Sequence, residues 1–348
     1  MGFLRVYLAI SVVLSHMGYN LLLPADQAVE LFFVISGFYM SFVLNERYNC
    51  TSQNVLFYKK RFLRLLPIYW ICSLLGLLVA YKISLEGLSS ELLFDFNLFK
   101  ESNFSSYPYL IFSNLFALGE DLALFLHWNI EESQLEFTAS TYSENYPMIR
   151  FFASPVAWSL GLEFLFYLIA PFFLRRNVKT VGLIFIVSLI IKLTIRYYFG
   201  LNDGNWTYRF FPSELCCFCL GYFCYRLYTI IEIRRYVIPE KVKYAILTVF
   251  VLLSLYHGSY IYMFLTFMLF FMLAVPVLFY VCKHDSFDRR IGDLSYVIYL
   301  VHPIVICLFI SVDIEIKPIL ILVATVAVSC LLYQFVERPI EKFRSKIN

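Results

Sequence analysis

Residues 5–16 read RVYLAISVVLSH, an apolar stretch that begins at Arg5 and ends at His16. Ionisable residues inside a membrane segment are costly, so by default they mark a functional site. In an α-helix, eleven steps of about 100° amount to three turns and roughly 20°, which puts both side chains on one face, about 16 Å apart along the axis. The stretch therefore predicts a membrane helix with a cation near one bilayer surface and an imidazole deeper inside.

The composition of the whole chain is that of a membrane protein. Of its 348 residues, 61% are hydrophobic and only 15% are charged, whereas a soluble domain has about 25% charged residues. Several runs approach or exceed the roughly 18 apolar residues that span a bilayer. The predicted fold is all-α and polytopic. Its expected transmembrane helices, about ten in number, lie at about residues 4–23, 29–45, 65–82, 156–174, 180–199, 209–228, 243–257, 260–281, 293–311 and 317–335.

The basic residues predict the direction of these helices. Lys and Arg accumulate in cytoplasmic connections, and 21 of the 28 basic residues lie at Arg5, in alternate connections or after the last helix. Both termini are therefore predicted to be cytoplasmic. The longest connection on the opposite side, about residues 84–155, carries ten Asp or Glu against Lys100 and Arg150, and it is predicted to be an outer loop.

One segment of that loop is apolar enough to be confused with a further span. Residues 107–127 read YPYLIFSNLFALGEDLALFLH, and Glu120 and Asp121 interrupt them. If this segment crossed the membrane, the charge bias of every later connection would be inverted, so we expect an interfacial or re-entrant segment on the outer side. No appended soluble domain is visible, and residues 1–348 are expected to form a single domain.

Two more groups of charged residues stand near predicted helix ends. Glu30 opens the second helix on the outer side, where it can orient His16, pair with a cation, or simply favour a helix N-terminus. Arg61 and Arg64 lie on one helix face on the cytoplasmic side. That face can clamp phosphates or contact lipid headgroups. Gly37, inside the second helix after a serine, is typical of close packing between spans.

Further candidates lie in later helices. Glu163 is flanked by apolar residues, which predicts a position in the membrane or at its outer edge, functional by default. Arg209 and Glu214 can pair with each other, or with Glu163 and Glu30, on the outer side. His302 is a second intramembrane histidine, either a site residue or a packed core histidine. Four clustered cysteines at 216–224 lie in an apolar helix with no nearby His, so they predict buried thiols and no metal site.

Taken together, six sequence blocks resemble the acyltransferase-3 family of integral membrane acyltransferases, in order and over nearly the whole chain. The blocks are R-x10-H at residues 5–16, V-(D/E)-L-F-F-V-x-S-G-F at 29–38, R-x-x-R-x-x-P at 61–67, W-S-L-x-x-E-x-x-F-Y at 158–167, G-x-x-S-Y-x-x-Y-L-x-H at 292–302 and E-R-P at 337–339. In the fourth block, Leu162 stands where many relatives have a second Glu.

The resemblance implies a stand-alone membrane-bound O-acyltransferase in the inner membrane of a bacterium. It implies an acyl-CoA donor, usually acetyl-CoA, used from the cytoplasm. It also implies an acceptor hydroxyl on a cell-surface polysaccharide, such as the O-antigen of lipopolysaccharide, or on a lipid-linked glycan. Apart from membrane lipid and these substrates, no tightly bound cofactor, metal ion or nucleic acid is expected.

These expectations assign roles to the candidates. Arg61 and Arg64 hold the CoA phosphates, and Arg5 lies near the entrance of the thioester. His16 activates the acceptor hydroxyl as a general base, or briefly carries the acyl group. Two carboxylates, Glu30 and Glu163, orient the imidazole or the sugar. The acceptor-site candidates are Trp158, Tyr167, His302 and Arg209.

A proton-coupled transporter or exporter is the alternative, because intramembrane His, Arg and Glu residues also suit a carrier. Such carriers often have inverted repeats with broken helices at matching positions. The two halves of this sequence show no such symmetry, which favours the enzyme.

Overall fold

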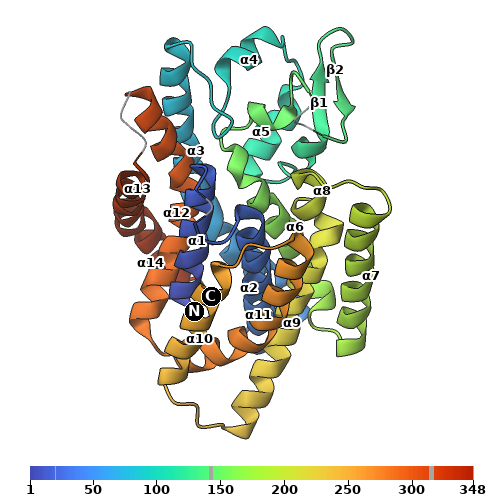
Figure 1. Cartoon of the computed structure of the whole chain (residues 1–348), viewed down its shortest axis with the longest axis vertical. Helices are drawn as coiled ribbons and strands as arrows, with labels where there is room; N and C mark the ends of the chain where they lie inside the picture. The colour runs from blue at the N-terminus through green and yellow to red at the C-terminus, as the bar shows by residue number, and fades with distance from the viewer. Residues whose placement is uncertain (20, 141–143, 313–316, 348) are drawn as a thin grey trace. The chain divides into compact units, whose positions relative to one another are not determined.

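The computed structural model describes residues 1–19, 21–140, 144–312 and 317–347, and helices dominate it (Figure 1). In that part of the chain, the named strands are β1 (Leu126–Asn129) and β2 (Gln134–Phe137), which pair antiparallel. The predicted all-α polytopic class is confirmed.

Eight helices in the described part are long and apolar enough to cross a membrane. They correspond to eight of the ten predicted spans. Their principal helices are α2 (Ala25–Glu46), α3 (Asn54–Leu85), α6 (Trp158–Phe173), α7 (Val178–Tyr197), α9 (Phe211–Arg234), α11 (Tyr260–Cys282), α12 (Ser286–Ser311) and α13 (Pro318–Leu332). A short helix, α14 (Arg338–Ser345), follows the last of them.

The other two predicted spans are present as shorter helices, α1 (Gly2–His16) and α10 (Lys241–Ser254). The prediction that the first helix continues to residue 23 is wrong. Gly18 adopts a left-handed φ of 81°, and the amide of Tyr19 donates to the carbonyl of Leu14 at 2.9 Å. This is the usual way in which a glycine ends an α-helix. The 15 residues of α1 cover about 22 Å.

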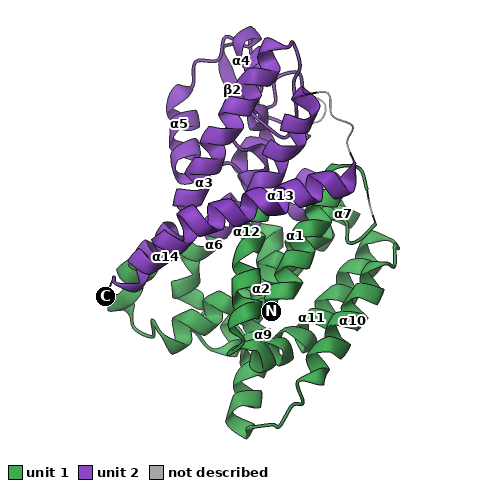
Figure 2. Ribbon diagram, turned by 90° about the vertical axis from the view of Figure 1, so that its left-hand side faces the viewer, with its two compact units in different colours: residues 1–57, 166–199, 212–299 green, residues 58–165, 200–211, 300–348 purple. Residues whose placement is uncertain are grey.

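The chain divides into two compact units, which are coloured separately in Figure 2. Unit 1 comprises residues 1–57, 166–199 and 212–299, and unit 2 comprises residues 58–165, 200–211 and 300–348.

In unit 1, α2 and α9 cross with their backbones in contact. A Cβ atom on Gly37 would lie 2.0 Å from the carbonyl oxygen of Phe218, and one on Gly221 would lie 2.2 Å from that of Val34. The ring of Phe33 stacks on that of Phe218 with centroids 4.7 Å apart. The close packing predicted at Gly37 is therefore confirmed, because only residues without a Cβ permit this approach.

The start of α1 is fixed on the start of α12, also within unit 1. The Asp288 carboxylate accepts hydrogen bonds from the amides of Gly2 at 2.7 Å and Phe3 at 3.2 Å. A carboxylate is favourable there because the first amides of a helix have no partners within it. A Cβ atom on Gly292 would lie 2.8 Å from the Cα atom of Gly2, so the two helices touch at this point.

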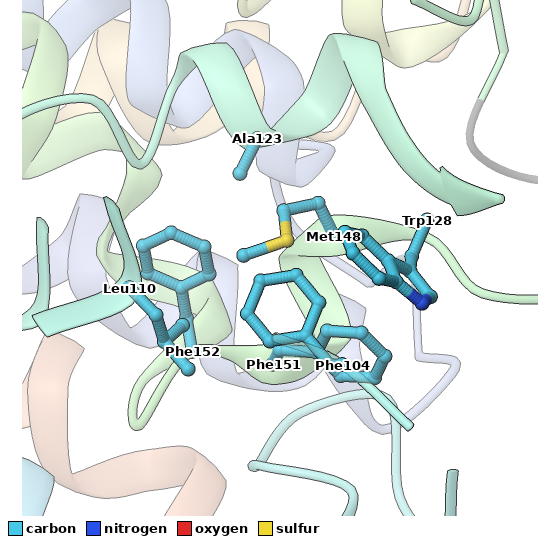
Figure 3. Close-up of a cluster of buried hydrophobic side chains, with 7 residues drawn as sticks. All are labelled: Phe104, Leu110, Ala123, Trp128, Met148, Phe151 and Phe152. Atoms are coloured by element: carbon cyan, nitrogen blue, oxygen red, sulfur yellow. The ribbon is translucent and has the colours of Figure 1, made fainter. Parts of the chain in front are cut away.

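In unit 2, the predicted outer loop 84–155 folds around a hydrophobic core of its own (Figure 3). It contains α4 (Phe96–Glu101), α5 (Tyr107–Phe116), several single helical turns and the β1–β2 hairpin. The buried residues of this core are Phe104, Leu110, Ala123, Trp128, Met148, Phe151 and Phe152. At ten residues, α5 is too short to cross a bilayer, as the expectation for 107–127 requires.

Candidate functional site

The helix α1 carries Arg5 and His16, and it is continuous between them. The predicted shared face and the separation of about 16 Å therefore hold. Both side chains are half-buried. Arg5 lies close to α12, since a Cβ atom on Gly292 would be 3.7 Å from its Nη1 atom. His16 is the last residue of the helix.

The predicted phosphate clamp lies on α3 in unit 2. Arg61 and Arg64 are both half-buried and stand one helical turn apart. Between them, Phe62 stacks on Phe164 of α6 with ring centroids 5.1 Å apart. Because Phe164 follows Glu163, the structure places the arginine segment beside the segment that carries this half-buried carboxylate.

Two of the acceptor-site candidates in unit 2 are in contact. The guanidinium carbon of Arg209 lies 5.0 Å from the ring centroid of Trp158 and 4.9 Å from that of Tyr208. Arg209 also donates a hydrogen bond to the Tyr208 hydroxyl at 2.7 Å. Tyr208 ends the short helix α8 (Gly204–Tyr208), and its ring packs edge-on against Trp158. A cation held over aromatic faces is attracted by their π-systems.

The other two acceptor-site candidates are buried in helices. His302 is fully buried within α12. Tyr167 lies one turn beyond Glu163 on α6, and its hydroxyl is 3.2 Å from the Ser36 Oγ atom. That contact ties α6 to α2 in unit 1.

Glu30 belongs to a buried ionic cluster in unit 1. The Nζ atom of Lys192 lies 2.8 Å from Glu30 Oε1 and 2.6 Å from Glu214 Oε1. The Tyr260 hydroxyl also donates to Glu30 Oε1. The cluster joins α2, α7, α9 and α11, and its three ionic side chains are 5% exposed or less. Of the roles predicted for Glu30, the structure shows pairing with a cation, and Glu214 has the same cation as its partner.

Lys192 was missed by the sequence analysis. It stands in the apolar run of the 180–199 helix, so the rule that intramembrane charges mark functional sites would have found it. The same helix carries Arg196, whose guanidinium carbon lies 4.4 Å from the Tyr260 ring centroid. What the sequence does not show is that carboxylates from two other helices converge on Lys192.

A second acidic group lies in unit 2, between α5 and the 3-10 turn Leu122–Phe125. Glu120 is fully buried, and its Oε1 atom accepts a hydrogen bond from the Tyr69 hydroxyl at 2.5 Å. Asp121 is 4% exposed. Burial raises the pKa of Glu120 to about 8 and that of Asp121 to about 6. The sequence marked these residues only as an interruption of an apolar segment.

Within the described residues, no group of three or more His, Cys, Asp or Glu side chains has the arrangement to hold a metal ion. Cys216, Cys217, Cys219 and Cys224 are buried and unbridged, as predicted.

Comparison with known proteins finds one family model, described as an acyltransferase domain, which matches residues 1–334. No curated protein and no solved structure matches the chain.

Replacement of Lys192 by Met tests the ionic cluster. The variant leaves two buried carboxylates without their cation, so the free energy of unfolding is expected to fall by about 3–5 kcal/mol. The measurement is the unfolding of the purified protein in detergent. Lys179→Met, an exposed lysine on the same helix, is the matched control. The double variant Lys192→Met/Glu214→Gln should recover part of the loss. Equal stability of Lys192→Met and Lys179→Met would contradict the cluster's role.

A pH series tests the burial of Glu120. Its pKa is raised from about 4.5 to about 8, so the folded chain keeps a proton that the unfolded chain releases. The stability contributed by this carboxyl is thus complete at low pH and is lost as pH rises through that window. The unfolding temperature of wild type should fall relative to that of Glu120→Gln as the pH rises from about 5 to about 8. If the unfolding temperatures of wild type and Glu120→Gln had the same dependence on pH, the raised pKa of Glu120 would be contradicted. The control is Glu131→Gln, which changes an exposed carboxylate.

Proposed function

The chain belongs to the acyltransferase-3 family of integral membrane acyltransferases, and from this membership we propose a specific reaction. The enzyme transfers an acyl group, most simply acetyl, from acyl-CoA on the cytoplasmic side to a sugar hydroxyl of a cell-surface polysaccharide or lipid-linked glycan. The observation that carries the proposal is α1, which holds a cation and an imidazole on one face about 16 Å apart. It runs between the proposed donor and acceptor sides.

The donor end of this proposal is basic. Arg61 and Arg64, one turn apart on α3 and half-buried, suit bidentate binding of the CoA phosphates. Arg5 is the cation nearest to the path of the thioester in the proposed scheme. Because guanidinium groups stay charged at all relevant pH values, this binding needs no proton transfer.

The chemical step is assigned to His16. Its imidazole takes the proton of the acceptor hydroxyl, the hydroxyl oxygen attacks the thioester carbonyl carbon, and the carbon–sulfur bond breaks. CoA leaves as a thiolate that takes up a proton. In the alternative route His16 carries the acyl group between two such transfers. Glu163 is proposed to orient the imidazole or the sugar.

The proposed alternation of the helices across the membrane is supported by the ionic cluster of unit 1. Glu30, Lys192, Glu214 and Tyr260 meet one another. Each comes from a helix end that the distribution of basic residues places outside. A wrong number of preceding spans would put some of these ends on opposite sides. The contacts thus agree with the predicted number of spans between these helix ends.

Mass spectrometry of the surface glycan tests the reaction and His16 together. A deletion strain should lose the mass of one acyl group per modified unit, and the wild-type gene should restore it. His16→Ala should leave the glycan unmodified because the hydroxyl is no longer activated. His284→Ala, an exposed histidine, is the control and should restore the group fully. An unchanged glycan with altered solute uptake would favour the transporter instead.

Binding of acetyl-CoA to the purified enzyme tests the arginine pair. Arg61→Ala and Arg64→Ala should each weaken the affinity about tenfold or more, since each removes a charge-assisted hydrogen bond to phosphate. Lys59→Ala removes an exposed charge on the same helix and should leave the dissociation constant unchanged. Affinities equal to that of wild type in both arginine variants would remove the pair from the donor site.

A further inference from the structure

The segment that carries Glu120 and Asp121 is held in place by three side-chain hydrogen bonds within unit 2. Trp70 Nε1 donates to the carbonyl of Leu115 at 2.7 Å, and the Tyr109 hydroxyl donates to that of Gly119 at 2.7 Å. The Tyr69 hydroxyl donates to Glu120 Oε1 at 2.5 Å. Residues 115–120 are therefore fixed against α3 and α5, and the two acidic side chains stand on a positioned turn.

The other side of this turn faces α6. A Cβ atom on Gly161 would lie 3.2 Å from both Asp121 Oδ1 and the carbonyl oxygen of Ala117. Gly161 thus lets the acidic turn approach α6 closely. It lies one helical turn after Trp158, and the guanidinium group of Arg209 lies over the ring of Trp158. The acidic pair is consequently next to the segment of α6 that begins with the acceptor-site candidate Trp158.

Two polar atoms of this turn are buried without a partner. Glu120 Oε2 and Asp121 Oδ1 have no hydrogen-bond partner in the described part of the chain. Each such atom costs about 1–3 kcal/mol, so their collection at a fixed turn needs an explanation.

The hydrogen-bonding character of these atoms indicates what would satisfy them. Burial raises the pKa of Glu120 to about 8, so near neutral pH this carboxyl keeps its proton and can donate from Oε2. Asp121, with a pKa of about 6, is mostly ionised there and accepts. A hydroxyl group both donates and accepts, so adjacent hydroxyls of a sugar match such a pair. An anionic ligand would be repelled by Asp121.

We propose that Glu120 and Asp121, with Tyr69 as the support of Glu120, form a subsite that binds hydroxyl groups of the acceptor glycan. This inference rests on the proposed function, and it assigns the two carboxyls to binding and not to the chemical step. It gives the folded outer region a role in acceptor recognition.

Steady-state kinetics with two substrates test the subsite. Labelled acetyl-CoA is the donor, and surface glycan purified from the deletion strain is the acceptor. Glu120→Gln and Asp121→Asn should each raise the KM for the glycan about tenfold, the effect of losing one hydrogen bond to a charged or buried partner. The KM for acetyl-CoA should stay at the wild-type value. Glu131→Gln, an exposed carboxylate in the same outer region, should behave as wild type.

The outcomes separate this inference from the proposed function. No transfer to the glycan by wild type would overturn the proposed function. Transfer by wild type together with an unchanged glycan KM in both variants would overturn the subsite alone. If both variants fail to fold, Tyr69→Phe decides, because it keeps both carboxyls and removes only the hydrogen bond that positions Glu120. A raised glycan KM in Tyr69→Phe supports the subsite, and an unchanged one overturns it.

Discussion

The ammonium group of Lys192 holds unit 1 together by pairing with Glu30 and Glu214 at 2.8 and 2.6 Å. An unpaired charge in a membrane interior is costly, so charges there pair with each other. One cation thereby joins three helices, and Tyr260 adds a fourth. Because Lys192 and Tyr260 both use Oε1 of Glu30, only Oε2 remains for another partner. Any part that Glu30 takes in catalysis is therefore exerted from a carboxylate whose position Lys192 fixes.

Unit 2 meets the same physical constraint in a different way. Glu120 is as fully buried as Glu30, but the hydrogen bond that it accepts comes from the neutral Tyr69. Burial raises the pKa of the Glu120 carboxyl to about 8, so it keeps its proton to a higher pH. The buried Glu30 thus has a cation as its partner, and the buried Glu120 has a neutral hydroxyl.

The sequence predicted the features that depend on local spacing. Apolar runs located the helices, the interval between Arg5 and His16 placed both on one helix face, and Gly37 marked a close crossing.

The sequence did not predict the features that depend on which distant segments meet. The partners of Lys192 lie 162 and 22 residues away. The aromatic core of residues 84–155 likewise has no periodic pattern, because it is assembled from turns and short elements. Gly18 shows how a local signal was overlooked: the apolar residues after it suggested continuation, but its left-handed conformation ends the helix.

That early end of α1 bears directly on the proposed chemistry. Its 15 residues cover about 22 Å, less than the roughly 30 Å of a bilayer core. His16 is consequently the terminal residue of the helix and not a residue buried in its middle. In the proposed reaction, the thioester is brought to this end of the helix. The acceptor hydroxyl has to reach only the end of the helix. Asp288, which fixes the start of α1, and Gly18, which ends it, therefore determine the length of the helix that carries Arg5 and His16.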